Sequence, residues 1–144
     1  MISTKGRYAL RLMLDLALHK SDGYIALKDI AQRQGVSKKY LEQIVPLLNK
    51  AGVVKTTRGY QGGYMIADNP DKYTVGTILR ITEGSLAPVS CLDENPNTCE
   101  RAETCMTLSV WKGLSDVITE YVDSITLQDI IDNNREREIN EYYI

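Results

Sequence analysis

Residues 26–64 constrain the fold most, because they have the pattern of a helix-turn-helix followed by a two-stranded wing. Apolar residues at positions 27, 30 and 31 share one helix face, and Gly35 follows them as a turn. Ser37 is a favourable N-cap for a second helix, in which positions 41, 44 and 45 form the apolar face. We expect Pro46 to kink or restart this helix, since proline lacks the N–H that would bond back to Glu42.

The segment after the second helix is predicted to form a β-hairpin. Residues 53–57 are rich in β-branched side chains, and residues 64–66 provide a return strand. The tip between them, residues 58–63, carries Arg58 and three glycines. An exposed polar helix face beside a basic hairpin is the arrangement that major-groove and phosphate contacts require. A small helical domain of another function also contains two short helices and a hairpin, so this motif alone leaves both interpretations open.

The charges divide the 144-residue chain into a basic front part and an acidic rear part. Residues 1–80 hold 13 Lys and Arg against 6 Asp and Glu, a net charge of +7, whereas residues 81–144 hold 4 against 13, a net charge of −9. This division suits a protein with nucleic acid on one side only, with an incidental surface imbalance as the alternative. The sequence has no run of 18 apolar residues and no apolar signal-peptide core, from which we expect a cytoplasmic location without a membrane span.

The chain before the motif is predicted to form a helix over residues 2–19. Its apolar residues have helical spacing, and Ser3 or Thr4 is available as the N-cap. The only histidine, His19, lies at the C-terminal end, where contact with the last carbonyls is its expected role. Basic side chains near the start of this helix either meet DNA phosphates or form a solvated turn, and they are Lys5, Arg7 and Arg11.

The rear part of the chain contains the longest helical pattern, residues 106–125. It follows a helix predicted over residues 75–82 and an irregular stretch over residues 88–104. The apolar face of an amphipathic helix outside a compact domain has to be buried against another element, and a second copy of the chain can bury it. A two-fold dimer also matches the symmetry of a palindromic operator. We therefore predict a homodimer with an interface formed by Trp111, Leu114, Ile118 and Tyr121. A short helix over residues 127–132 and a charged tail over residues 135–144 follow.

All three cysteines lie in one short segment, at Cys91, Cys99 and Cys105. They are not on an apolar stripe, their odd number argues against a structural disulfide in a cytoplasmic chain, and their spacing is not that of a structural zinc site. Three thiolates just before a helix N-terminus suit an iron–sulfur cluster or a thiol redox switch. An enzyme has little support, because the sequence shows no nucleophile paired with a base and no phosphate-binding loop before a helix.

Several short motifs resemble the Rrf-type winged-helix transcriptional regulators, and together they cover nearly the whole chain. They are Ser3-Thr4-Lys5-Gly6-Arg7-Tyr8-Ala9, Tyr40-Leu41-Glu42-Gln43, Arg58-Gly59 with Gly62-Gly63-Tyr64, and Ile125-Thr126-Leu127. The cysteine segment looks most like the iron–sulfur cluster regulators of the IscR type. The Tyr142-Tyr143-Ile144 ending looks more like the cysteine-metabolism repressors of Gram-positive bacteria.

The resemblance to IscR-type regulators implies a dimer that binds a [2Fe–2S] cluster and controls cluster-assembly genes. It implies Cys91, Cys99 and Cys105 as three of the ligands, but the fourth ligand differs. Those regulators have a histidine three residues after the third cysteine, where this chain has Leu108. Other relatives take an acidic residue from the partner's first helix, where this chain has Tyr8. Carboxylates in the segment are therefore open candidates, namely Asp93, Glu94, Glu100 and Glu103.

These observations predict a mainly α-helical protein with a small β-hairpin wing. Residues 1–84 are expected to be a winged helix-turn-helix domain, residues 85–105 a cysteine-bearing sensor loop, and residues 106–144 a dimerisation helix and tail. The alternative is a thiol-redox or cysteine-metabolism repressor that senses thiol redox state or binds a cysteine-synthesis enzyme, and that carries no cluster. The protein partners that these two interpretations suggest are cluster-assembly proteins and cysteine-synthesis proteins. Double-stranded DNA is the expected partner, and the residues predicted to contact it are Ser3, Thr4, Lys5, Arg7, Ser37, Lys38, Lys39, Tyr40, Glu42, Gln43, Arg58 and Gly59.

Overall fold

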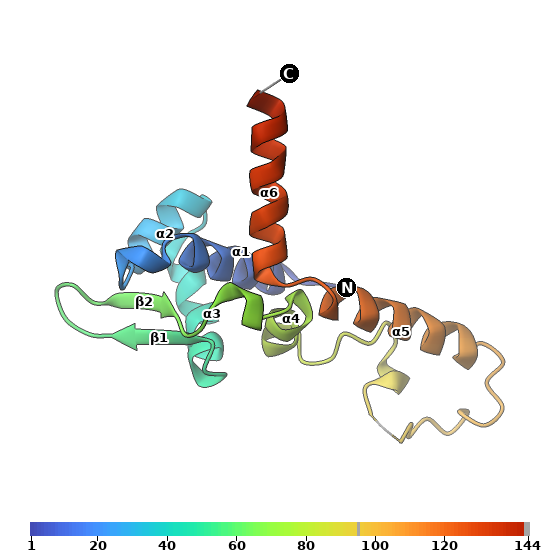
Figure 1. Cartoon of the computed structure of the whole chain (residues 1–144). Coiled ribbons are helices and arrows are strands. Elements are labelled where there is room, and N and C mark those ends of the chain that lie inside the picture. The colour runs from blue at the N-terminus through green and yellow to red at the C-terminus, as the bar shows by residue number, and fades with distance from the viewer. Residues whose placement is uncertain (95, 143–144) are drawn as a thin grey trace.

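The computed structural model describes residues 1–94 and 96–142, and it confirms a mainly helical fold with one small wing (Figure 1). The α-helices and strands, in chain order, are α1 (Thr4–Leu18), α2 (Leu27–Gln34), α3 (Lys38–Lys50), β1 (Val54–Thr57), β2 (Gly63–Ile66), α4 (Val75–Glu83), α5 (Leu108–Asp123) and α6 (Leu127–Tyr142). Short 3₁₀ helices occur at Lys20–Asp22, Pro70–Lys72 and Ser90–Leu92.

The hydrophobic core is built around α1, whose buried stripe contacts α2, α3, α4, the wing and the start of α6. The predicted apolar faces of the helix-turn-helix are the ones that are buried. Burying each such aliphatic side chain contributes roughly 1.5–3 kcal/mol, so the core fixes how α2 and α3 lie against α1. The largest fully buried apolar side chains are Leu12, Met13, Leu16, Ile30, Leu41, Ile44, Leu48, Ile66, Ile78 and Leu127.

The turn between α2 and α3 forms as the sequence predicts. Gly35 adopts a left-handed conformation with φ of 64°, which a residue without a Cβ reaches at little cost. Ser37 then caps α3, because its hydroxyl accepts a hydrogen bond of 3.0 Å from the backbone N–H of Tyr40. Of the two outcomes predicted for Pro46, a kink or a restart, the restart does not occur, since α3 continues through Pro46 to Lys50. Pro46 is exposed, and water can therefore hydrate the carbonyl that lacks its usual donor.

The wing is an antiparallel pair in which Val54 lies opposite Ile66 and Thr57 lies opposite Gly63. Residue Ile25, just before α2, extends this sheet by one bridge, with two backbone hydrogen bonds of 2.8 Å to Tyr64. A Cβ on Gly63 would lie 2.2 Å from the carbonyl oxygen of Ile25. Glycine at this position therefore lets the wing attach directly to the start of the helix-turn-helix.

The two C-terminal helices differ in how far they match the sequence prediction. α5 lies within the predicted range, at the end of the molecule opposite the wing (Figure 1). The prediction of a short final helix over residues 127–132 is wrong, because α6 continues to Tyr142 and takes in most of the expected charged tail. Side-chain pairs four residues apart support this extension, including Asn134 with Glu138 and Arg137 with Glu141. Tyr143 and Ile144, and the side chain of Tyr142, lie outside the described part of the chain.

Within residues 1–94 and 96–142, the structure contains no helix whose length and apolar character would allow it to cross a bilayer.

Candidate DNA-binding surface and cysteine segment

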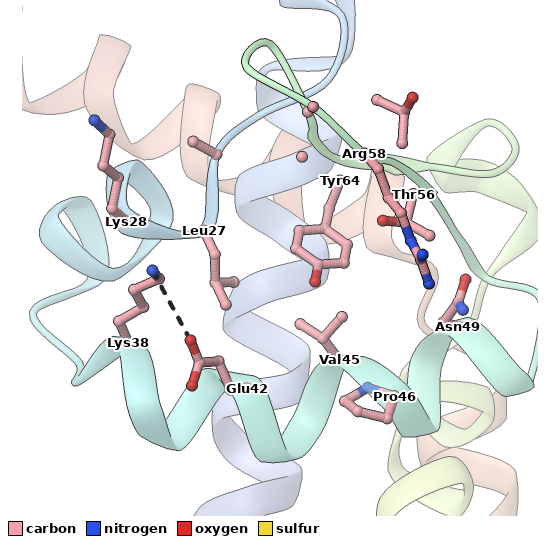
Figure 2. Close-up of a pocket in the computed structure, with 15 residues that line it drawn as sticks. Leu27, Lys28, Lys38, Glu42, Val45, Pro46, Asn49, Thr56, Arg58 and Tyr64 are labelled. Carbon is pink, nitrogen blue, oxygen red and sulfur yellow. Dashed lines mark ion pairs between the residues drawn. The ribbon is translucent and has the colours of Figure 1, made fainter.

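An open cleft of about 640 Å³ lies between the start of α2, one face of α3 and the wing (Figure 2). Lys28 and Lys38 stand at one side of it, and Arg58 extends from the wing toward Asn49 of α3 at the other. Glu42 is the acidic residue among those that line the cleft, and it forms an ion pair of 3.9 Å with Lys38. Both partners are more than half exposed, so this pair is weak and both side chains remain available to a ligand.

Some of the predicted contact residues at α3 are available to a ligand, and others are engaged within the protein. Lys38 and Glu42 line the cleft, while Lys39 and Gln43 are exposed on the adjoining surface. Ser37 and Tyr40 are engaged within the protein, because Ser37 caps the helix and the Tyr40 ring packs edge-on against Tyr8 at 5.4 Å between centroids. The helix face thus offers two positive charges, one carboxylate and one amide to a bound duplex.

The N-terminus of α1 carries an interaction that the sequence prediction missed. The Ser3 hydroxyl accepts a hydrogen bond of 3.2 Å from the N–H of Gly6 and so caps the helix. The backbone N–H and hydroxyl of Ser3 both donate to one carboxylate oxygen of Glu83, at 2.9 and 2.5 Å. These hydrogen bonds from Ser3 hold the pKa of Glu83 below its usual range. A carboxylate therefore already occupies the electropositive end of α1.

The other predicted residues of α1 remain at the surface around this carboxylate. Thr4 is exposed and its hydroxyl accepts a hydrogen bond of 3.2 Å from Arg7, while Lys5 is half-buried. On the wing, Arg58 and Gly59 are exposed as expected. The neighbouring Tyr60 is fully exposed at the tip of the wing and was not among the predicted contacts. Its position in the sequence, between Arg58 and the glycines at 62 and 63, is the signal that could have identified it as a candidate contact. The cleft residues that were not predicted as contacts include the polar side chains of Lys28, Asn49, Thr56 and Thr57.

A buried carboxylate joins α1 to the end of α2. The side chain of Asp15 is only 2% exposed, and it accepts two hydrogen bonds from Arg33, at 2.7 and 3.1 Å. Gln34 donates a third at 2.9 Å. Burial alone raises the pKa of Asp15, but the hydrogen bonds from Arg33 and Gln34 outweigh it and hold the pKa below its usual value. His19 is placed as predicted, with its Nδ1 2.8 Å from the carbonyl oxygen of Asp15.

The three cysteines lie on the segment between α4 and α5. Cys91 is half-buried, whereas Cys99 and Cys105 are exposed, and all three are free thiols. The sulfur of Cys105 lies 3.4 Å from the hydroxyl of Thr107. This hydrogen bond, together with backbone N–H groups at the start of α5 and the charge of Arg101, lowers the pKa of the Cys105 thiol. Leu108 is the first residue of α5 and is half-buried.

These thiols suit an iron–sulfur cluster by donor type but are not assembled around a common point. Thiolates are the usual ligands of such clusters, and one chain segment supplies three of them. In residues 1–94 and 96–142, however, no group of three His, Cys, Asp or Glu side chains is close enough to hold a metal ion. Binding a cluster would therefore require the segment to rearrange and a fourth ligand to join it.

A helix-turn-helix with an attached wing and a basic cleft between them defines a DNA-binding protein of the winged-helix class. Residues 2–133 match the family model Rrf2, described as an iron-dependent transcriptional regulator. The chain belongs to this family. It is accordingly a transcriptional regulator and not an enzyme, as the sequence motifs predicted.

The relatives of this chain include regulators named IscR and CymR. The chain is 38% identical to the HTH-type transcriptional regulator IscR of Pectobacterium atrosepticum, over 92% of this chain and 79% of that protein. It is 41% identical to the HTH-type transcriptional regulator CymR of Bacillus subtilis, over 99% of both chains.

Solved structures of regulators with both names share the fold. The structure of CymR, described as the global cysteine regulator of B. subtilis, matches with a TM-score of 0.76 over 92% of this chain and 97% of that one, at 41% identity. The structure of T. potens IscR matches with a TM-score of 0.77 over 95% of this chain and 90% of that one, at 42% identity.

Proposed function

We propose that this protein is a dimeric, DNA-binding repressor or activator that senses iron–sulfur cluster status through Cys91, Cys99 and Cys105. The observation that carries this proposal is the confinement of three free thiols to one segment that leads directly into α5. The basic cleft and the exposed face of α3 would contact the operator, with Arg58 at the edge of a groove. The genes under its control would be those of cluster assembly, as the resemblance to IscR-type regulators implies.

The proposed dimer forms through α5. Among the described residues this helix has none that is buried, although it carries large apolar side chains. Trp111 is 37% exposed, Leu114 is 42% exposed and Tyr121 is 66% exposed. Packing these side chains and Ile118 against a second copy would remove them from water and place two copies of α3 over the half-sites of a palindromic operator.

The proposed cluster would take Cys91, Cys99 and Cys105 as ligands and a fourth ligand from elsewhere. Leu108 cannot ligate iron, so a carboxylate, a water, a small thiol or a group of the partner subunit must complete the site. Ligation would draw the three thiols together and so order the segment that joins α4 to α5. Within that segment the candidate carboxylates are Asp93, Glu94, Glu100 and Glu103.

A second candidate function is a thiol-redox or cysteine-metabolism repressor that carries no cluster. The exposed Cys105, with its lowered pKa, favours this alternative, because the thiolate is the form that oxidants attack. The similarity to CymR over nearly the whole chain supports it as well.

Anaerobic purification followed by visible absorption and by iron and sulfide analysis separates the two candidates. The cluster proposal predicts a coloured protein with iron and sulfide in equal amounts, most simply a [2Fe–2S] centre. Replacing any one of Cys91, Cys99 and Cys105 by Ala should abolish or destabilise the cluster, whereas the matched control Ser90→Ala should keep it. A colourless protein that fails to take up a cluster on reconstitution overturns the cluster proposal and supports the thiol switch.

The fourth ligand is tested by Leu108→His. This change would supply an imidazole at the position the IscR resemblance implies, and it should lengthen the lifetime of the cluster in air. An unchanged lifetime would mean that another group already fills the fourth position.

A further inference from the structure

Five side chains form a continuous chain of contacts across the three helices α1, α2 and α3. This series of contacts begins inside the protein at Asp15 and ends at Tyr40, in the first turn of α3, beneath the surface proposed to contact DNA. Its members, in order of contact, are Asp15, Gln34, Arg11, Tyr8 and Tyr40.

The inner half of this chain is polar and tightly defined. Gln34 uses its amide nitrogen to donate to the buried Asp15, at 2.9 Å, and its amide oxygen to accept from Nε of Arg11, at 3.1 Å. A second nitrogen of Arg11 donates to the backbone carbonyl of Gln34, the last residue of α2. The guanidinium of Arg11 is therefore held in place although its side chain is exposed.

The outer half of the chain is aromatic. The guanidinium carbon of Arg11 lies 5.4 Å from the ring centre of Tyr8, within the range of a cation–π contact. Tyr8 in turn meets the Tyr40 ring at 5.4 Å and an interplanar angle of 85°, the edge-to-face geometry that aromatic pairs prefer. Both tyrosines are half-buried, so each side chain is partly packed against the protein and partly exposed to solvent.

We infer that Tyr8 is a positioning residue for operator recognition. Tyr40 lies next to Lys39 and two residues before Glu42, so the packing of its ring helps to set the rotation of the first turn of α3. Tyr8 fixes that ring, and Arg11 fixes Tyr8 to the end of α2. Removing the aromatic ring of Tyr8 should therefore misplace the base-contacting side chains without unfolding the domain. This inference rests on the proposed DNA-binding function.

Two variants and one control test the inference. Tyr8→Phe keeps the ring and both of its contacts, whereas Tyr8→Leu keeps an apolar side chain but removes the ring. Tyr24→Leu is the control, because Tyr24 is exposed and lies in the loop before α2, outside the chain of contacts. Each protein is titrated with a duplex selected by the wild type from a random-sequence pool, with its single-base variants, and with an unselected duplex. Thermal unfolding is measured in parallel.

We expect Tyr8→Phe and Tyr24→Leu to bind as the wild type does. Tyr8→Leu should lose about tenfold in affinity for the selected duplex, keep its affinity for the unselected duplex, and show a flattened preference among single-base variants. Because Tyr8 and Tyr40 act through one contact, the loss in the Tyr8→Leu, Tyr40→Leu double variant should be smaller than the product of the two single losses.

Three results would overturn the inference. Equal losses on both duplexes would assign Tyr8 to a phosphate contact, and multiplicative losses in the double variant would show that the two rings act independently. Loss of binding in proportion to a lowered unfolding temperature would reduce Tyr8 to a core residue. Failure of the wild type to select any duplex is a different result, because it overturns the proposed DNA-binding function itself.

Discussion

Asp15→Asn tests whether the buried carboxylate organises the helix-turn-helix. The substitution keeps the shape of the side chain but removes the charge, and it replaces an oxygen that accepts hydrogen bonds with an NH₂ group. Hydrogen bonds to a charged group contribute about 1.5–3 kcal/mol each, and Asp15 accepts three. The Arg33 side chain is 36% exposed, so water compensates part of the loss. We expect the free energy of unfolding at pH 7 to fall by about 2–3 kcal/mol.

The pH dependence gives this prediction a second, independent check. The pKa of Asp15 is lowered in the folded protein, so its stabilising contribution is complete above the unfolded-state pKa of about 3.9 and is lost as the pH falls through the folded-state pKa. The difference between the wild type and Asp15→Asn should therefore persist from pH 7 to pH 5, and should shrink below about pH 4.

Urea unfolding followed by circular dichroism at pH 7, 5 and 3.5 measures both effects. Asp71→Asn is the matched control, because Asp71 is exposed and has no ion pair within the described residues. It should change the free energy of unfolding by less than about 0.5 kcal/mol at every pH. The reasoning would be refuted if Asp15→Asn had the same free energy of unfolding as the wild type at pH 7. It would also be refuted if the difference in free energy of unfolding were as large at pH 3.5 as at pH 7.

Three further predictions concern DNA binding and assembly. Glu42→Ala should relax the preference among single-base operator variants more than it lowers affinity, because a carboxylate accepts from cytosine and repels other base edges; an unchanged preference profile would contradict this role. Arg58→Ala should weaken operator binding by about 1–3 kcal/mol if it contacts a base and should flatten the salt dependence if it contacts a phosphate; a loss below about 0.3 kcal/mol would place the wing away from DNA. Ile118→Glu should yield monomers in sedimentation and abolish binding to paired half-sites, and a dimer with full affinity would show that α5 packs only within its own chain.

Local pattern was sufficient to predict the helix-turn-helix and the wing. The spacing of apolar residues gives the buried face of each helix directly, because that face has to meet the core whatever the neighbouring element is. The caps were equally predictable, since Ser3, Ser37 and Gly35 act through backbone groups within three or four residues. His19 contacts a helical carbonyl four residues before it for the same reason.

What the sequence could not reveal are the polar contacts between distant segments. Ser3 meets Glu83 across 80 positions and Asp15 meets Arg33 across 18, and no periodicity links such pairs. The length of α6 escaped prediction for another reason. Its last ten residues carry no apolar stripe, and the side-chain pairs that support them are common on any charged surface.

The last turn of α4 contacts both the start of α1, at the proposed DNA-binding surface, and the end of α5, the helix that follows the cysteine segment. Glu83 binds the N-terminus of α1, beside the predicted phosphate contacts. Arg80, one turn earlier, forms two hydrogen bonds with Asp123 at the end of α5, at 2.7 and 3.0 Å. The cysteine segment begins immediately after this turn, at Gly84. A shift of α5 relative to α4 must therefore either break the Arg80–Asp123 pair or carry the last turn of α4 with it. In the second case it would also move the carboxylate of Glu83 that holds the start of α1. Under the proposed function, this would connect a change in the cysteine segment with the DNA-binding surface.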